Sequence, residues 1–171
     1  NRSDTTIQSQ REILSDLVAE EPHPDQVLQG MSTRDWKKKT PATGWTNQDQ
    51  VSHLAHLEGF AAEVIVQGQA RIDAENIKDF DAWTALGPEE GRPQRHQEVI
   101  EWWRHGRADV VDALSRMLAS ERIPWIWGDM SARSFATMRL METWAHGLDI
   151  KAAVLGRVIP IPEEDLEEEE E

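Results

Sequence analysis

The chain has 171 residues, of which 39% are hydrophobic, and it contains no cysteine. This length suits one domain with a sizeable core, and the lack of cysteine excludes disulfides, thiolate metal ligands and a cysteine nucleophile. The formal net charge of −14 repels phosphate backbones, and no basic stripe offsets it, so we expect no nucleic-acid partner.

Two further exclusions concern membranes and export. No apolar run approaches the roughly 18 residues that indicate a membrane span, and no secretory segment opens the sequence. We therefore expect a cytoplasmic protein without a membrane partner. Residues 163–171 hold eight of the 32 acidic residues, which is typical of a solvated, disordered end.

The first predicted element is a helix over about residues 5–19, where apolar residues recur at helical spacing. Pro22 and Pro24 follow it, so this helix should end or kink near Glu20. A short helix is predicted over residues 25–31. Residues 37–44 then form a loop by their proline, glycine and charge content.

A second long helix is predicted to begin sharply after Thr46 and to run to about Gln67. Thr46 followed by Asp49 has the spacing of a capping box, with an acidic residue favoured at the positive end of the helix. His53 and His56 lie in its second and third turns. They are neighbours on the surface, or one faces the core and the other solvent.

Residues 68–92 are predicted to form a long connection with one short helix over about residues 70–80. Gly87-Pro88 and Gly91-Arg92-Pro93 are interpreted as helix breakers, and connections of this length often cover a site. A third long helix follows over residues 94–119. Its predicted buried positions are Val99, Ile100, Trp103, Val110, Val111, Leu114, Met117 and Leu118.

After a short apolar connection, residues 123–128, Ser131 is predicted to cap a last long helix that ends at Gly156. Residues 158–161 have only a weak strand pattern. Four long helices without alternating strands predict an all-α fold, a four-helix bundle with long crossover connections. We assign residues 1–160 to this bundle and residues 161–171 to the acidic tail.

The last helix carries a polar stripe in apolar surroundings. Arg139, Glu142, His146 and Asp149 follow the 3, 4, 3 spacing of one helix face. Glu142 and His146 can direct a carboxylate oxygen and an imidazole nitrogen to a common point, which is half of a metal site. The simpler alternative is a hydrogen-bonded pair in a partly buried groove.

His53 on the second long helix completes a possible ligand set with Glu142 and His146. Three protein ligands that leave a fourth position open are the pattern of a catalytic rather than a structural zinc site. Bundles commonly build metal sites in this way, from polar groups that two long helices carry into the interior.

Two segments carry a resemblance to a known family. Residues 44–54, GWTNQDQVSHL, and residues 139–150, RLMETWAHGLDI, resemble the signature segments of the mycothiol-dependent maleylpyruvate isomerase branch of the DinB-like metal-binding bundles. The resemblance implies that His53, Glu142 and His146 bind a divalent metal, most often zinc. It also implies that the open position receives mycothiol or a related low-molecular-weight thiol.

Other polar residues near this set have two interpretations each. Asp49 either orients the His53 imidazole or serves only as part of the helix cap. Asp149 either accepts a hydrogen bond from His146 or closes the polar stripe. His56 is interpreted as a surface histidine or as support for the ligands rather than as a ligand.

Arg139 either pairs with Glu142 or holds a substrate carboxylate, and we favour the pair. The function we expect is a metal-dependent isomerase or transferase that uses a thiol on a small electrophilic substrate. A hydrolase with a metal-bound water and a non-catalytic metal- or ligand-binding module are the alternatives.

Overall fold

The computed structural model describes residues 15, 22–42 and 44–155. Several expectations lie outside these residues: all but one residue of the first predicted helix, its end near Glu20, the end of the last helix at Gly156, and everything beyond it. The boundary between bundle and acidic tail therefore stays a prediction.

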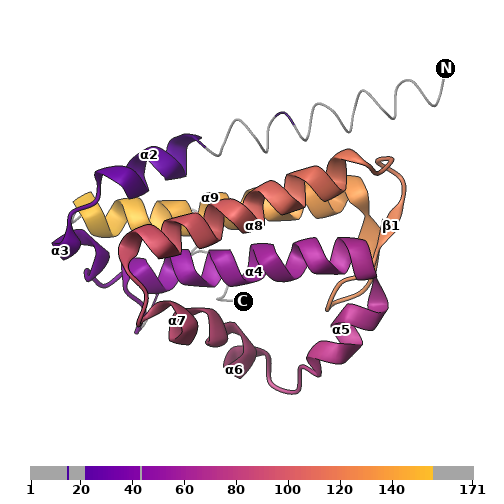
Figure 1. Ribbon diagram of the computed structural model, residues 1–171, viewed down its shortest axis with the longest axis horizontal. Helices are drawn as coiled ribbons and strands as arrows, with labels where there is room; N and C mark the ends of the chain where they lie inside the picture. The colour runs from indigo at the N-terminus through magenta and orange to yellow at the C-terminus, as the bar shows by residue number, and fades with distance from the viewer. Residues whose placement is uncertain (1–14, 16–21, 43, 156–171) are drawn as a thin grey trace, which may run out of the picture.

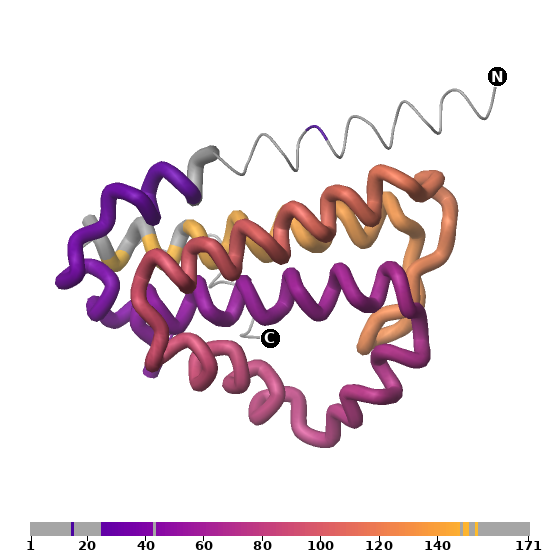
Figure 2. Tube along the Cα trace, in the orientation of Figure 1, coloured from indigo at the N-terminus to yellow at the C-terminus, as the bar shows by residue number. Residues whose placement is uncertain are grey.

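Three long helices form the frame of the molecule: α4 (Asn47–Gln67), α8 (His96–Ser115) and α9 (Ala132–Leu155). Helix α4 packs against both α8 and α9, and Figures 1 and 2 show the three running side by side along the long axis. The helical-bundle prediction is confirmed for the described residues. None of their helices is both long and apolar enough to cross a bilayer.

The predicted starts of α4 and α9 are confirmed by their caps. The Thr46 hydroxyl accepts from the Asp49 backbone N–H, and the Asp49 carboxylate accepts from the Thr46 N–H. The Ser131 hydroxyl likewise accepts from the Ser134 N–H at 3.1 Å. At its other end α4 stops at Gly68, whose φ of 70° favours glycine.

Two short helices precede α4 at one end of the bundle (Figure 1). Helix α2 (Pro22–Gly30) begins three residues earlier than expected. Helix α3 (Thr33–Trp36) begins with a capping box between Ser32 and Asp35. The predicted loop that follows is pinned by a bridge between Lys39 and Thr46, which brings it against the start of α4.

The connection between α4 and α8 differs from the prediction. It contains three short helices, α5 (Gln69–Glu75), α6 (Phe80–Thr84) and α7 (Leu86–Gly91), along one side of α4 (Figure 1). The Gly87-Pro88 pair lies inside α7 instead of breaking it, because proline in a first helical turn removes an N–H that needs no partner there. A Cβ on Gly87 would lie 2.8 Å from the Ser52 carbonyl oxygen, so glycine allows the close approach to α4.

Two other expectations need correction. Helix α8 ends at Ser115, and Leu118 beyond it is 49% exposed rather than buried. The short apolar connection starts at the end of one strand, β1 (Arg122–Ile123), and leads to a second, β2 (Met130–Ser131). The two strands pair antiparallel. Strands of two residues are too short for an alternating pattern to be visible in the sequence.

The buried side chains form two apolar clusters with a polar layer between them. The cluster at the hairpin end contains Leu57, Phe60, Val64, Trp83, Val110, Leu114, Ile123, Trp125 and Phe135. The cluster at the α2 end contains Leu28, Trp36, Val51, Leu54, Val99, Ile100, Trp103 and Ile150. Each long helix places one buried charged residue between the two clusters: Glu58 on α4, Arg107 on α8 and Arg139 on α9.

Candidate metal centre

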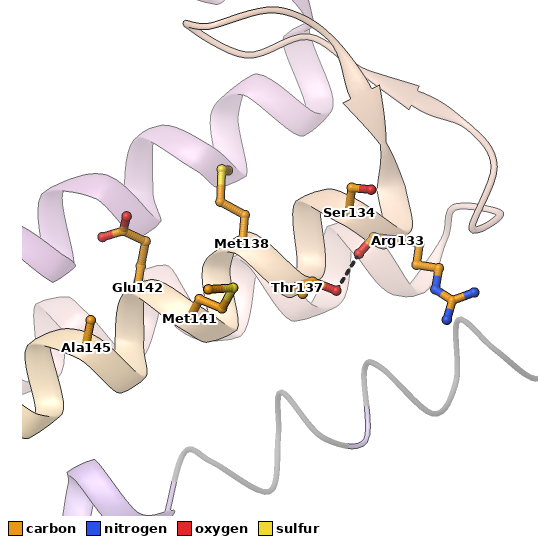
Figure 3. Close-up of a pocket in the computed structure, with 7 residues that line it drawn as sticks. All are labelled: Arg133, Ser134, Thr137, Met138, Met141, Glu142 and Ala145. Carbon is orange, nitrogen blue, oxygen red and sulfur yellow. Dashed lines mark hydrogen bonds between the residues drawn. The ribbon is translucent and has the colours of Figure 1, made fainter. Parts of the chain in front are cut away.

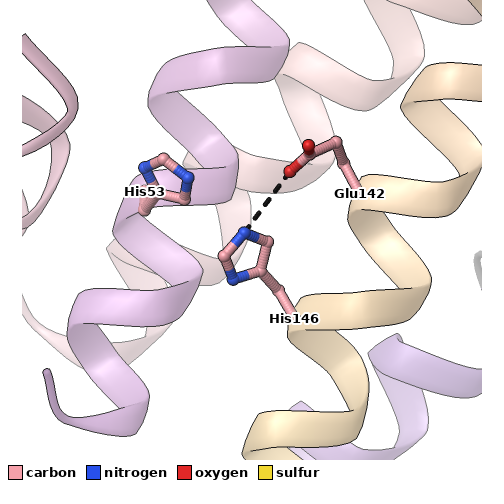
Figure 4. Close-up of side chains that lie close together, drawn as sticks. All are labelled: His53, Glu142 and His146. Atoms are coloured by element: carbon pink, nitrogen blue, oxygen red, sulfur yellow. Dashed lines mark ion pairs between the residues drawn. The ribbon is translucent and has the colours of Figure 1, made fainter. Parts of the chain in front are cut away.

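His53, Glu142 and His146 lie together in the polar part of the bundle. Helix α4 supplies His53 and α9 supplies the other two, so the set joins two long helices (Figure 4). One ligand atom from each residue falls within 4.8 Å of the others. The two imidazole centroids are 4.8 Å apart, and His146 Nε2 lies 3.4 Å from Glu142 Oε2.

The surroundings of these side chains favour the protonation states that metal ligands need. Burial first, and the neighbouring His146 second, lower the pKa of His53 to about 4, so its imidazole is neutral at pH 7. His146 also lowers the pKa of the Glu142 carboxyl, and Arg139 acts in the same direction. The site therefore offers a neutral imidazole and an ionised carboxylate without first losing protons from them.

The donor set fits a divalent first-row metal. Zinc bonds of about 2.0–2.2 Å place tetrahedral ligand atoms about 3.4 Å apart, so ligand atoms within 4.8 Å of one another need to close by roughly 1.4 Å at most. The buried Nδ1 of His53 has no hydrogen-bond partner among the described residues. Two imidazoles and one carboxylate are a common zinc set, but metal binding here stays a prediction.

Gln50 is a further residue at this site that was not predicted from the sequence. Its side chain is fully buried, and its Oε1 lies 2.5 Å from His146 Nδ1. Its Nε2 donates to Thr40 Oγ1 at 3.0 Å. Gln50 precedes His53 by three residues and so shares its helix face, which was the available signal.

The loop before α4 and the connection after it also reach the site. The Trp45 ring packs against His53 with centroids 4.8 Å apart. The backbone carbonyl of Thr84, the last residue of α6, acts on His53 in the direction that raises its pKa, against the larger effect of burial. Segments on both sides of α4 therefore enclose His53.

The contacts of Asp49 in the structure are those of the helix cap and of Arg92, and a role in orienting His53 stays a prediction. One carboxylate oxygen accepts from the Thr46 N–H at 3.1 Å, and the other accepts from Arg92 Nε at 3.3 Å. Both oxygens are engaged away from His53. The interpretation as a helix cap is the one that these contacts support.

His56 and Asp149 do not belong to the ligand cluster. The His56 ring packs on Trp83 with centroids 5.2 Å apart, and burial lowers its pKa. Asp149 is partly exposed, and no hydrogen bond joins it to His146 within the part of the chain that the structure describes. Supporting roles for these two residues stay predictions.

The favoured pairing of Arg139 with Glu142 needs correction. Arg139 is 2% exposed, and its Nη1 lies 3.7 Å from Oε1 of Glu58, a buried carboxylate on α4. Arg107 of α8 approaches the other oxygen of Glu58 at 3.6 Å. Glu58 attracts both guanidiniums because it is fully buried, whereas the Glu142 side chain is 41% exposed and solvent screens its charge. Substrate binding by Arg139 stays a prediction.

Glu142 also lies at one end of a groove along α9. The groove has a volume of about 490 Å³, and its lining residues are Arg133, Ser134, Thr137, Met138, Met141, Glu142 and Ala145. In Figure 3 Arg133 stands at one end of this set, and Glu142 and Ala145 stand towards the other. Glu142 is therefore shared between the candidate ligand set and a mostly apolar groove that also contains a cation, Arg133.

Comparisons with known proteins concern the family and the fold of the chain. The family model described as the mycothiol maleylpyruvate isomerase N-terminal domain matches residues 19–151. Two curated relatives are the uncharacterized proteins MT0041 and Rv0036c of Mycobacterium tuberculosis strains CDC 1551 and H37Rv, each 34% identical over 154 residues. The match covers 86% of this chain and 58% of theirs, so the chain spans less than two thirds of their length.

Solved structures give the same fold. A crystal structure of the mycothiol-dependent maleylpyruvate isomerase superposes with a TM-score of 0.63 at 16% identity, and that of a mutant form with 0.68 at 15%. Each match covers 82% of this chain and 60% of the other. At such low identity the likeness concerns the helical fold, which is the predicted DinB-like bundle.

Proposed function

Because the chain belongs to the family of the mycothiol maleylpyruvate isomerase N-terminal domain, we propose that it binds a divalent metal, zinc before others, and works with mycothiol or a similar low-molecular-weight thiol. The reaction is an isomerisation or a group transfer on a small electrophilic substrate. One observation carries this proposal: His53, Glu142 and His146 converge from two helices to within 4.8 Å.

The protein's own part is to hold these three ligands ready. Burial keeps His53 neutral, so a nitrogen lone pair is available at pH 7. Glu142 is ionised and partly exposed, which places a negative charge at the mouth of the site. Trp45 restricts the rotation of His53, and Gln50 restricts that of His146. A set of three ligands leaves one position for an exchangeable molecule.

The chemistry that this set supplies when loaded is the activation of a thiol. A divalent cation favours the thiolate form of a bound thiol, and a thiolate can add to an electrophilic carbon and leave again. Such reversible addition serves isomerisation, and its permanent form serves transfer.

We place the substrate in the groove that ends at Glu142. Its walls at Met138, Met141 and Ala145 are apolar, and its volume suits a small molecule. Arg139 would have to leave Glu58 to hold a substrate carboxylate, because its side chain is almost fully buried. Exposed Arg133 at the far end of the groove is the more accessible cation for this purpose.

The test begins with metal stoichiometry. Protein stripped by a chelator and dialysed against zinc should retain one ion per chain by elemental analysis. His53→Ala and His146→Ala should each weaken binding strongly, whereas His105→Ala, on the exposed face of α8, is the matched control. Absence of bound metal from the zinc-treated wild type would refute the proposal.

A second measurement separates thiol use from hydrolysis and from simple binding. Cobalt-substituted protein should develop a sulfur-to-cobalt charge-transfer band when mycothiol is added. An unchanged spectrum at millimolar thiol, together with turnover of esters or amides, would support the hydrolase. An unchanged spectrum without any turnover would leave a metal-binding module.

A further inference from the structure

A chain of hydrogen bonds leads from the loop before α4 to His146. It begins at the backbone carbonyl of Trp45, which accepts from the Thr40 hydroxyl at 3.0 Å. A second carbonyl, that of Ala42, lies farther away at 3.5 Å. Because carbonyl oxygens have no proton to give, the single hydroxyl proton of Thr40 points to the backbone, with Trp45 as the nearer acceptor.

The fixed hydroxyl in turn orients the Gln50 amide. Thr40 Oγ1 has used its proton and can only accept from the Gln50 side chain, 3.0 Å away, so the amide NH₂ of Gln50 faces it. The reversed amide would present its oxygen to Thr40, and that contact would need the proton that Trp45 already receives. The network itself therefore turns Gln50 Oε1 towards His146.

The orientation of Gln50 decides which nitrogen of His146 carries a proton. Gln50 Oε1 only accepts, and it lies against His146 Nδ1, so this nitrogen must be the donor. The other nitrogen, Nε2, faces the remaining ligands and lies 3.4 Å from Glu142 Oε2. Figure 4 shows this nitrogen directed at Glu142, with His53 on the other side.

We propose that Gln50, held by Thr40 and the Trp45 carbonyl, is a positioning residue that fixes the Nδ1 proton of His146 and presents Nε2 as the metal ligand. This inference rests on the proposed metal site. It adds that the donor and acceptor roles along this chain of hydrogen bonds are set outside the site. They are set by a backbone carbonyl of the loop that is pinned by the bridge between Lys39 and Thr46. The same loop carries Trp45 against His53, so it orients both histidines.

The decisive variants remove or keep the acceptor at position 50. Gln50→Met preserves the length of the side chain and removes the acceptor, and it should weaken zinc binding about 10- to 100-fold, as loss of such partners does at zinc sites. Gln50→Glu keeps an acceptor and should bind zinc within about threefold of the wild type.

Gln48→Met is the matched control. Gln48 is also a glutamine of α4, but its side-chain amide donates to the backbone carbonyls of Gly91 and Gln94 and not to Thr40. Its substitution should leave zinc affinity unchanged. At the start of the chain of hydrogen bonds, Thr40→Val should weaken zinc binding less than Gln50→Met does, and Thr40→Ser should restore it.

Nitrogen-15 NMR of histidine side chains in the metal-free protein separates positioning from packing. His146, identified by its absence in His146→Ala, should show a proton on Nδ1 in the wild type and in Gln48→Met. In Gln50→Met the ring of His146 should no longer be held with its proton on Nδ1. A purely structural glutamine would alter stability in Gln50→Met without moving this signal.

The outcomes keep the two proposals apart. A wild-type protein that binds no zinc refutes the metal site. Zinc binding that is unchanged in Gln50→Met, or a wild-type His146 whose neutral ring lacks a proton on Nδ1, refutes the role of Gln50 while leaving the metal site standing.

Discussion

The bundle contains two neighbouring polar clusters, and both take residues from α4 and α9. Their side chains differ in exposure and so suit different roles. The candidate metal centre takes His53 from α4 and Glu142 and His146 from α9. The buried charge cluster takes Glu58 from α4, Arg139 from α9 and Arg107 from α8. Glu58 follows His53 by five residues, and Arg139 precedes Glu142 by three, so the clusters are neighbours.

Their difference is access to solvent. Side chains of the metal centre are exposed by 41% at Glu142 and 19% at His146. Glu58 and Arg107 are fully buried. A buried charge is tolerated only while its partner stays in place, whereas an exposed one can exchange partners. One cluster is therefore suited to holding helices together and the other to binding a solute.

The largest effect is expected at the buried charge cluster. Glu58→Gln removes the carboxylate that lies 3.6–3.7 Å from two guanidiniums and should lower the free energy of unfolding by about 3–5 kcal/mol. Urea unfolding measures this loss. Glu63→Gln, at a surface pair with Arg71, is the control and should cost only about 0–1 kcal/mol. Equal losses would contradict the contrast between buried and exposed charge.

The lowered pKa of His53 should make the stability of the metal-free protein depend on pH. The pKa of His53 is lowered from 6.5 to about 4 in the folded protein, so only the unfolded chain gains a proton there between these values. Stability should therefore fall as the pH drops from 6.5 to 4, by about 1.4 kcal/mol per unit and about 3 kcal/mol in total.

This dependence is measured by urea unfolding in the presence of a chelator. His53→Gln should remove this share of the slope, and His105→Gln on the exposed face of α8 is the matched control. A slope that is identical in the wild type and in His53→Gln would show that His53 is not held neutral by burial.

Zinc binding should stabilise the folded protein through the three candidate ligands and should not depend on the buried charge cluster. Zinc at about 100 times its dissociation constant should raise the free energy of unfolding by about 2.7 kcal/mol, or Tm by roughly 5–10 °C, and a chelator should reverse the gain. Differential scanning calorimetry measures it. The gain should vanish in His146→Ala and persist in a Glu58 variant that still folds, since Glu58 is outside the ligand set.

The smallest effect tests whether the start of α4 serves folding or the metal. Asp49→Ala removes the acceptor for the Thr46 N–H and the partner of Arg92, and it should cost about 1 kcal/mol. Its zinc affinity should stay within about twofold of the wild type, because both carboxylate oxygens face away from His53. A large loss of affinity would instead support the interpretation in which Asp49 orients His53.

Much of the frame follows from the sequence alone. The spacing of Thr46 and Asp49 gave the start of α4, and Ser131 gave that of α9, because caps are local hydrogen bonds between residues a few positions apart. The 3, 4, 3 spacing of Arg139, Glu142, His146 and Asp149 likewise predicted one helix face. The helical fold was therefore predictable from contacts within single helices.

Only the tertiary structure decided which polar residues meet. Gln50 reaches His146 across 96 positions of sequence, and Arg139 pairs with Glu58 rather than with Glu142 one turn away. Such choices depend on which side chains are buried when helices pack, because burial strengthens one pairing and solvent screens another. Local spacing could name the candidates for a site, but the packing of α4 against α9 selected its partners.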